Sequence, residues 1–160
     1  MGTRSITVFR EGKENLCAVY RQMDGYPEGM GQDLHEMLKG HTLCNGFTMA
    51  DREGGKAHNG MGCLAAYVIG KLKDGQIGSI YVTRVSPAYL NGDTFNHKNG
   101  HSWSGAAYGY IISDKDGNIN LKVVEIGWKE PSKVLFDGPI DKADFKGEEF
   151  QTAKKLANSA

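Results

Sequence analysis

The sequence has no long apolar segment and little cysteine. It contains no run of about 18 apolar residues, and its first residues lack the apolar region of a secretory signal, so we expect no membrane association. The three cysteines, Cys17, Cys44 and Cys63, are odd in number and have no CxxC spacing. This pattern argues against a disulfide framework and against a zinc site. We therefore expect a cytoplasmic protein in a reducing compartment.

The sequence also lacks an excess of charge of either sign. Nineteen Lys and Arg residues balance nineteen Asp and Glu residues, which makes the formal net charge zero. A protein that binds bulk nucleic acid normally has a basic excess that neutralises phosphates, so we expect no bulk nucleic-acid partner. Zero net charge gives little colloidal repulsion and is compatible with a homo-oligomer.

Glycine, in contrast, is abundant, with 22 of 160 residues. This is about twice the average usage of roughly 7%. Hydrophobic residues make up 39% and charged residues 24%, which is typical of a globular protein. Because the glycines are not periodic, they indicate turns, helix caps and close backbone approaches.

The hydrophobic pattern predicts strands and helices in a mixed order. A first helix is expected after residue 31, with Leu34, Met37 and Leu38 on one face and Gly40 at its end. Residues 41–60 are expected to be irregular. The other expected helices are 61–72 and 148–156, and the expected strands are 3–10, 15–22, 76–85, 106–113, 119–127 and 133–136.

This order predicts an α+β fold with one domain over residues 1–160. We expect a mostly antiparallel or mixed sheet, two main helices packed on one face, and a short C-terminal helix.

The first glycine-rich loop, residues 20–31, leaves a predicted strand and enters a predicted helix. Glycines at such a junction let backbone N–H groups face a ligand, and the helix N-terminus carries partial positive charge. Arg21 could form two hydrogen bonds to a phosphate or carboxylate, and Tyr26 offers a ring for stacking. The alternative is a tight turn in which Asp24 and Gly25 serve only the geometry.

The second glycine-rich loop, residues 54–62, also enters a predicted helix. Lys56 and His58 supply hydrogen-bond donors. The loop is not a Walker A motif, because Ala57 stands where that motif needs Ser or Thr. If both helix N-termini face one cleft, the natural ligand is anionic and multiply charged, such as a nucleotide. The alternative is a flexible surface connection.

The third loop, residues 91–103, contains Asp93, His97 and His101. These could ligate a metal, but the glycines and asparagines between them argue against the helix that His-x-x-x-His spacing requires, so we expect no metal site. We expect a flap over a ligand, with Trp103 or Phe95 as a lid. The alternative is a long surface loop.

No set of residues predicts catalysis. A pair formed by Cys44 or Cys63 with His41 or His58 has the right chemistry. However, a cysteine in an apolar helix is usually inert. We therefore predict no catalytic residue and no cofactor.

Residues 2–5 (GTRS) and 20–31 (YRQMDGYPEGMG) form a GTRS segment and a YRQxDGYPxGxG-like motif. In these two segments the chain resembles a family of small, uncharacterised bacterial and phage proteins. The resemblance covers roughly the first forty residues. The family has no assigned activity, so the resemblance implies no catalytic residue. It implies only a recurring feature made of Arg4, Arg21, Asp24, Gly25, Tyr26, Gly29 and Gly31.

The leading hypothesis is non-catalytic binding of a small anionic, nucleotide-like ligand. A phage sponge that sequesters an immune signalling nucleotide would be one instance. We expect Arg4 and Arg21 to bind the charge of the ligand, and Tyr26 and Trp103 to stack on it. We expect Lys56 and His58 to hold a second anionic group.

Two alternatives remain open at this stage. One is a hydrolase or phosphodiesterase that acts on such a ligand, with His97 or His101 as general acid or base. The other is a protein-interaction inhibitor of a host complex.

Overall fold

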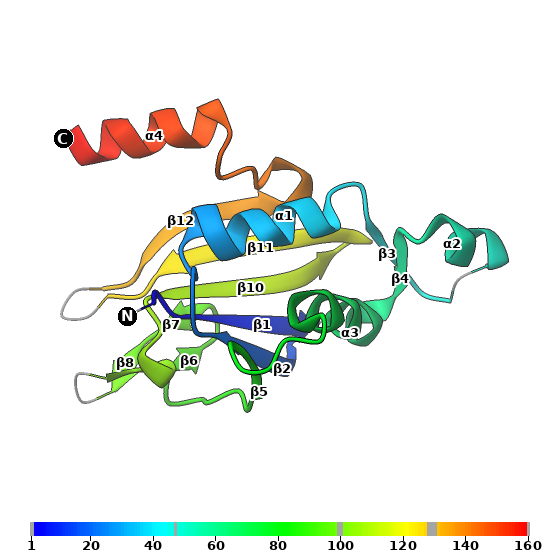
Figure 1. Ribbon diagram of the computed structural model, residues 1–160, viewed down its shortest axis with the longest axis horizontal. Helices are drawn as coiled ribbons and strands as arrows, with labels where there is room; N and C mark the ends of the chain where they lie inside the picture. The colour runs from blue at the N-terminus through cyan, green and yellow to red at the C-terminus, as the bar shows by residue number, and fades with distance from the viewer. Residues whose placement is uncertain (1, 47, 99–100, 128–130, 160) are drawn as a thin grey trace.

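A six-stranded mixed sheet forms the centre of the computed structural model (Figure 1). The structure describes residues 2–46, 48–98, 101–127 and 131–159. The strand order is β12-β11-β10-β1-β2-β5, with β1 and β10 parallel and every other neighbouring pair antiparallel. The strands are β1 (Ser5–Glu11), β2 (Glu14–Arg21), β5 (Ile80–Thr83), β10 (Tyr108–Lys115), β11 (Asn118–Glu125) and β12 (Lys133–Pro139).

The central strand β1 serves two hydrophobic cores. Successive side chains of a strand point to opposite faces, and on β1 both faces are apolar. Ile6 and Val8 belong to one buried cluster, whereas Phe9 belongs to the other. The sheet is therefore covered on both sides.

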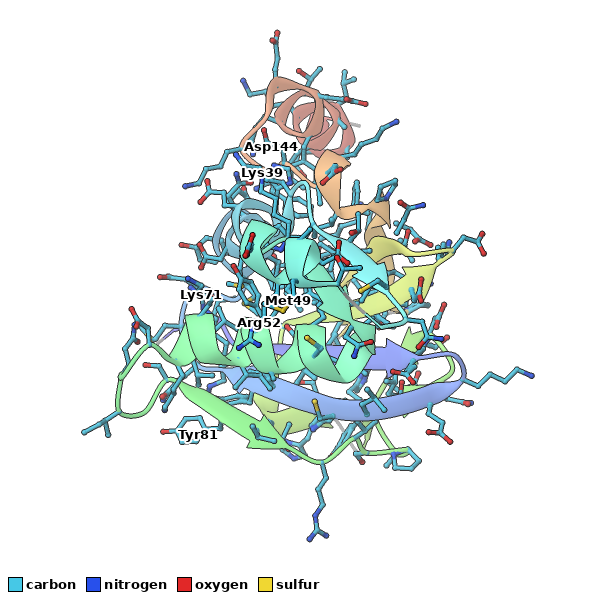
Figure 2. All side chains as sticks on the ribbon, turned by 90° about the vertical axis from the view of Figure 1, so that its right-hand side faces the viewer. Lys39, Met49, Arg52, Lys71, Tyr81 and Asp144 are labelled. Atoms are coloured by element: carbon cyan, nitrogen blue, oxygen red, sulfur yellow. The ribbon has the colours of Figure 1, made fainter. Side chains whose placement is uncertain are left out.

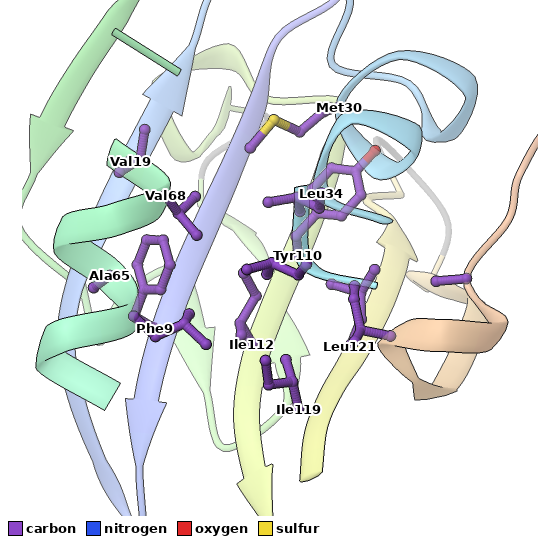
Figure 3. Close-up of a cluster of buried hydrophobic side chains, with 14 of the residues drawn as sticks. Phe9, Val19, Met30, Leu34, Ala65, Val68, Tyr110, Ile112, Ile119 and Leu121 are labelled. Atoms are coloured by element: carbon purple, nitrogen blue, oxygen red, sulfur yellow. The ribbon is translucent and has the colours of Figure 1, made fainter. Parts of the chain in front are cut away.

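Two helices cover the face that carries Phe9. They are α1 (Gln32–Leu38), which follows a π-helical turn over Pro27–Gly31, and α3 (Gly60–Lys73). Leu34 of α1 and Val68 of α3 are fully buried against the sheet, as Figure 3 shows. The α+β class, the mixed sheet and the two helices on one face are confirmed.

The other face is covered by the segment between β5 and β10. It contains the short strands β6 (Leu90–Asn91), β7 (Thr94–Phe95), β8 (His97–Lys98) and β9 (His101–Ser102) and a 3-10 turn over Trp103–Gly105.

The prediction of Phe95 or Trp103 as a lid is wrong, because these rings are only 1% and 4% exposed and form part of the second core. The sheet needs apolar cover on this face, and the loop supplies it. Residues 99–100 of the predicted flap lie outside the described residues.

The sequence suggested that residues 41–60 are irregular, but residues 41–46 and 48–60 form an arm that extends from the body (Figure 1). The arm contains β3 (Thr42–Cys44), α2 (Met49–Gly54) and β4 (Ala57–Asn59). Thr48 and Asp51 form a capping box at the start of α2, and Gly55 ends it in the left-handed conformation. Because α2 buries no residue, it has no hydrophobic period that sequence analysis could detect.

The C-terminal helix α4 (Glu148–Ser159) follows a 3-10 turn over Ile140–Lys142 and lies over the sheet edge near β12 (Figure 1). The Phe150 ring packs edge-on against Phe145 with centroids 4.9 Å apart. Lys154 forms an ion pair with Glu28 at 2.5 Å. Among the described residues, no helix combines the length and the apolar character that crossing a bilayer requires.

Close packing at Gly31 gives a stability prediction. A Cβ atom at Gly31 would lie 2.7 Å from Cε2 of Phe145, whose ring is fully buried. We expect Gly31→Ala to lower the free energy of unfolding by roughly 1–3 kcal/mol, since overpacking forces a core ring to move. Urea denaturation measures the change.

Gly62→Ala is the matched control, because Gly62 lies in α3 and a Cβ atom there would meet open space. We expect it to stabilise the protein by up to about 1 kcal/mol through helix propensity. Equal effects of the two substitutions would contradict the packing explanation.

Candidate functional site

A cleft of about 410 Å³ opens between α1, the C-terminal part of α3 and the segment before β5. This volume lies within the range of roughly 300–1,000 Å³ typical of small-molecule sites. Arg21 and Asp24 line it from the first glycine-rich loop, Asp33 and Glu36 from α1, and Lys71 from α3. We call this the α1–α3 cleft.

Arg21 is held in place by three contacts and retains a free donor. Its Nε donates to the carbonyl of Met23 at 2.7 Å, and its Nη1 contacts Asp33 Oδ2 at 2.6 Å and Met30 Sδ at 3.3 Å. Its Nη2 has no acceptor among the described residues. The guanidinium is thus oriented at the cleft and can still donate to a ligand.

Lys71 provides the second cation. Its ammonium lies 5.7 Å from the centroid of the Tyr67 ring and makes no hydrogen bond or ion pair within the described part of the chain. Figure 2 shows Lys71 near one end of α3. A cation–π contact at an exposed site is worth only about 0.5–1 kcal/mol, so the ammonium can readily take an anionic partner.

Carboxylates give the same cleft acceptors. Asp24, Asp33 and Glu36 all line it. Asp24 accepts a hydrogen bond from the Tyr26 hydroxyl at 3.2 Å, and this bond raises the pKa of Tyr26, so that the phenol stays protonated. Because cationic donors and carboxylate acceptors share one cleft, it complements a ligand that has an anionic group together with hydroxyl or amino groups.

The glycines of the first loop serve close packing. A Cβ atom at Gly25 would lie 2.7 Å from Cβ of Ser5, one at Gly29 would collide with the carbonyl of Asp24, and one at Gly31 would meet Phe145. The N–H of Gly25 donates to Thr3 at 2.9 Å, and that of Gly29 donates to Tyr26 at 2.9 Å. These N–H groups therefore hold the turn, and the three glycines are not among the described residues that line the cleft.

Arg4 and Trp103 do not join the cleft. A Cβ atom at Gly105 would lie 2.8 Å from Nη1 of Arg4, which places this guanidinium beside the turn that covers the opposite face of the sheet. Trp103 is buried in the core on that face. Arg21 pairs with Ser5, the residue after Arg4, and successive side chains of an extended chain point to opposite faces of the sheet. The side chains of Arg4 and Arg21 therefore lie on opposite faces.

Lys56 and His58 lie at the far end of the molecule. A Cβ atom at Gly60 would lie 3.8 Å from Glu11, at the end of β1, whereas Gly25 packs on Ser5 at its start. A strand of seven residues spans about 20 Å. The sequence left open whether the two glycine-rich loops face one cleft; they do not, because each loop packs at a different end of β1.

Two histidines at this far end form a pair that the sequence did not predict. Nδ1 of His41 lies 2.8 Å from Nε2 of His58, and the rings are inclined by only 18°. Burial lowers the pKa of both imidazoles, and the positive charge of Lys56 lowers that of His41 further. Both rings are therefore neutral at pH 7, and one donates its N–H to the other.

The cysteine–histidine pair considered from the sequence has a different geometry. The Cys44 thiol donates to the backbone carbonyl of His58 at 3.4 Å rather than to its ring. Cys63 is exposed on α3. The thiol of Cys44 thus supports the β3–β4 connection.

The polar residues of the third loop lie in separate contacts and do not form one site. Asp93 forms ion pairs with Arg10 and Lys122. His97 and His101 lie on the paired strands β8 and β9. In the described ranges, no group of three or more His, Cys, Asp or Glu residues is arranged to hold a metal ion.

The chain matches no protein-family model, no curated protein and no solved structure. The resemblance of the N-terminal segment to small bacterial and phage proteins therefore remains a prediction.

The histidine pair gives a pH prediction. Because the pKa values of His41 and His58 are lowered in the folded state, the unfolded chain takes up more protons as the pH falls through about 6.5. The pair's contribution to stability is thus complete above this pH and is lost below it. We expect His58→Gln to flatten the decline in the free energy of unfolding between pH 7.5 and 5.5, measured by urea denaturation.

His41→Gln is the second variant, since it removes the other imidazole of the pair. It should flatten the decline as well. Identical pH profiles for wild type and His58→Gln would show that the pair does not couple protonation to stability.

Proposed function

We propose that the protein binds a small anionic, nucleotide-like ligand in the α1–α3 cleft without turning it over. The observation that carries the proposal is the presence of two cationic side chains in one cleft of suitable size. Arg21 retains Nη2 as a free donor, and Lys71 contacts only an aromatic ring in the described residues. Sequestration of a signalling nucleotide, as by a phage sponge, is one instance of this function.

The lining of the cleft supports a nucleotide over a simple inorganic anion. Arg21 and Lys71 bind the phosphate, while Asp24 and Glu36 accept hydrogen bonds from sugar hydroxyl and base amino groups. Apolar side chains, including Leu72, offer a surface for the base. Inorganic phosphate would leave these acceptors and this surface unused.

The same lining supports binding rather than turnover. No histidine or cysteine is among the described residues that line the cleft. General acid–base catalysis near neutral pH most often uses histidine, and covalent catalysis needs an activated nucleophile.

A hydrolase is the second candidate, and the observation that favours it is the His41–His58 pair at the far end of the molecule, not His97 or His101, on which the sequence-based alternative rested. One imidazole of such a pair can accept a proton while the other orients it. Chromatography of nucleotides after prolonged incubation with the protein separates the two functions, because a binding protein returns its ligand intact.

The experiment begins with a thermal-shift panel of nucleoside monophosphates, cyclic dinucleotides and ADP-ribose. At 100 times the dissociation constant a ligand stabilises the fold by about 2.7 kcal/mol, which raises Tm by several degrees. Calorimetric titration then compares variants. We expect Lys71→Gln and Arg21→Gln each to weaken binding by roughly tenfold to a hundredfold, the effect of losing a charge-assisted hydrogen bond.

Lys56→Gln is the matched control, because this lysine is exposed at the opposite end of β1 from the cleft. It should bind as tightly as the wild-type protein. A panel that gives no shift with the wild-type protein overturns the proposal and favours an interaction with a protein partner.

A further inference from the structure

Two hydroxyl groups of the central strand are buried without a partner. Ser5 and Thr7 are 0% exposed, and neither Ser5 Oγ nor Thr7 Oγ1 has a hydrogen-bond partner within the described residues. The large majority of buried polar atoms are hydrogen-bonded, because an unsatisfied one is unfavourable in the folded state. Two such groups on one strand, two residues apart, require an explanation.

Their position connects them with the α1–α3 cleft. Ser5 is the register partner of Arg21 on β2. Thr7, the next residue of β1 on the same face, is the register partner of Val19. Directly opposed residues of an antiparallel pair have Cβ atoms about 4.5–5.5 Å apart. The side chains of Arg21 and Ser5 therefore leave their strands side by side, with that of Thr7 next along the same face.

Ser5, Thr7 and Met30 are not among the described residues that line the cleft, but Met30 connects Arg21 with the core around Thr7. Its Sδ lies 3.3 Å from Nη1 of Arg21, and its side chain packs in the same cluster as Val19 and Tyr110, the two register partners of Thr7. Figure 3 shows Met30 near β1 between these two labelled side chains. An unbranched thioether side chain adopts several rotamers and adapts to a changed space more readily than a branched one.

The first glycine-rich loop forms the roof over the strand. Gly25 packs against Ser5, and its backbone is fastened by a bond from its N–H to Thr3 at 2.9 Å and by the Tyr110 hydroxyl, which donates to its carbonyl at 2.7 Å. The roof is thus anchored at the start of β1. We expect rotation of the Met30 side chain to open the way from Arg21 to the hydroxyls, a movement that requires neither of these bonds to break.

We propose that Ser5 and Thr7 form an inner subsite of the α1–α3 cleft, where their hydroxyls donate to oxygen atoms of the anionic group that Arg21 binds. This inference rests on the proposed function and adds the residues that recognise the anion. The folded protein keeps unsatisfied hydroxyls at this place because the ligand satisfies them. Functional sites commonly retain groups that reduce the stability of the free protein.

The test compares stability and affinity in the same variants. Thr7→Val is nearly isosteric and removes only the hydroxyl, while Ser5→Ala is an independent second variant. Each should raise the Tm of the free protein, because an unsatisfied buried group is removed. Each should also weaken binding of the nucleotide that gives the largest shift in the panel, by roughly tenfold.

Thr7→Ser is the matched control, because it keeps the hydroxyl and loses a methyl group. It should retain the affinity of the wild-type protein although its Tm falls. A higher Tm with weaker binding for Thr7→Val, together with a lower Tm and unchanged binding for Thr7→Ser, supports the subsite.

The possible failures are distinguishable. If Thr7→Val and Ser5→Ala bind as tightly as wild type while Lys71→Gln still weakens binding, the subsite is wrong and the proposed function stands. If no nucleotide binds the wild-type protein, both proposals are wrong.

Discussion

The pairing of β1 between β10 and β2, with both faces of β1 buried, is the constraint on which the rest of the structure depends. Because successive side chains alternate, this strand demands apolar cover on two sides. Helices α1 and α3 supply it on one side, and the segment around Phe95 and Trp103 supplies it on the other. The loop after β5 therefore has a structural role.

The same strand organises the candidate site. Arg21 leaves β2 beside the start of β1, and the glycine-rich loop must then cross over Ser5 to reach α1. That crossing leaves no space for a Cβ atom at Gly25. The loop is thus a packed wall, and the charged side chains around it provide the chemistry of the cleft. The close crossing also brings Arg21 and Asp24 to the α1–α3 cleft.

The far end of the sheet has a different character. The arm built from β3, α2 and β4 buries few residues of its own, and its attachment includes the His41–His58 bond beneath the Tyr67 ring. A segment with few buried apolar contacts is expected to open more easily than the core. The histidine pair therefore stands where protonation can affect a weakly held part of the molecule without disturbing the α1–α3 cleft.

The sequence alone determined the fold class and most regular elements, because hydrophobic periods and glycine positions are local signals. The hairpin of β1 and β2, the helices α1 and α3 and the hairpin of β10 and β11 could all be predicted in this way. The arm around α2 could not, because it has no buried face and hence no period.

Among the predicted site residues, Arg21 and Asp24 of the first loop both line the cleft, and their closeness in the sequence was enough to predict that they lie together. Only the tertiary structure decided that Arg4 and Trp103 lie on the opposite face of the sheet from the α1–α3 cleft. It also decided that Lys56 and His58 lie at the other end of β1 from the cleft, and that Lys71 joins Arg21 in lining it. The physical reason is that strand alternation and strand length separate residues whose sequence signals look alike, while packing of α3 against β1 unites residues fifty positions apart.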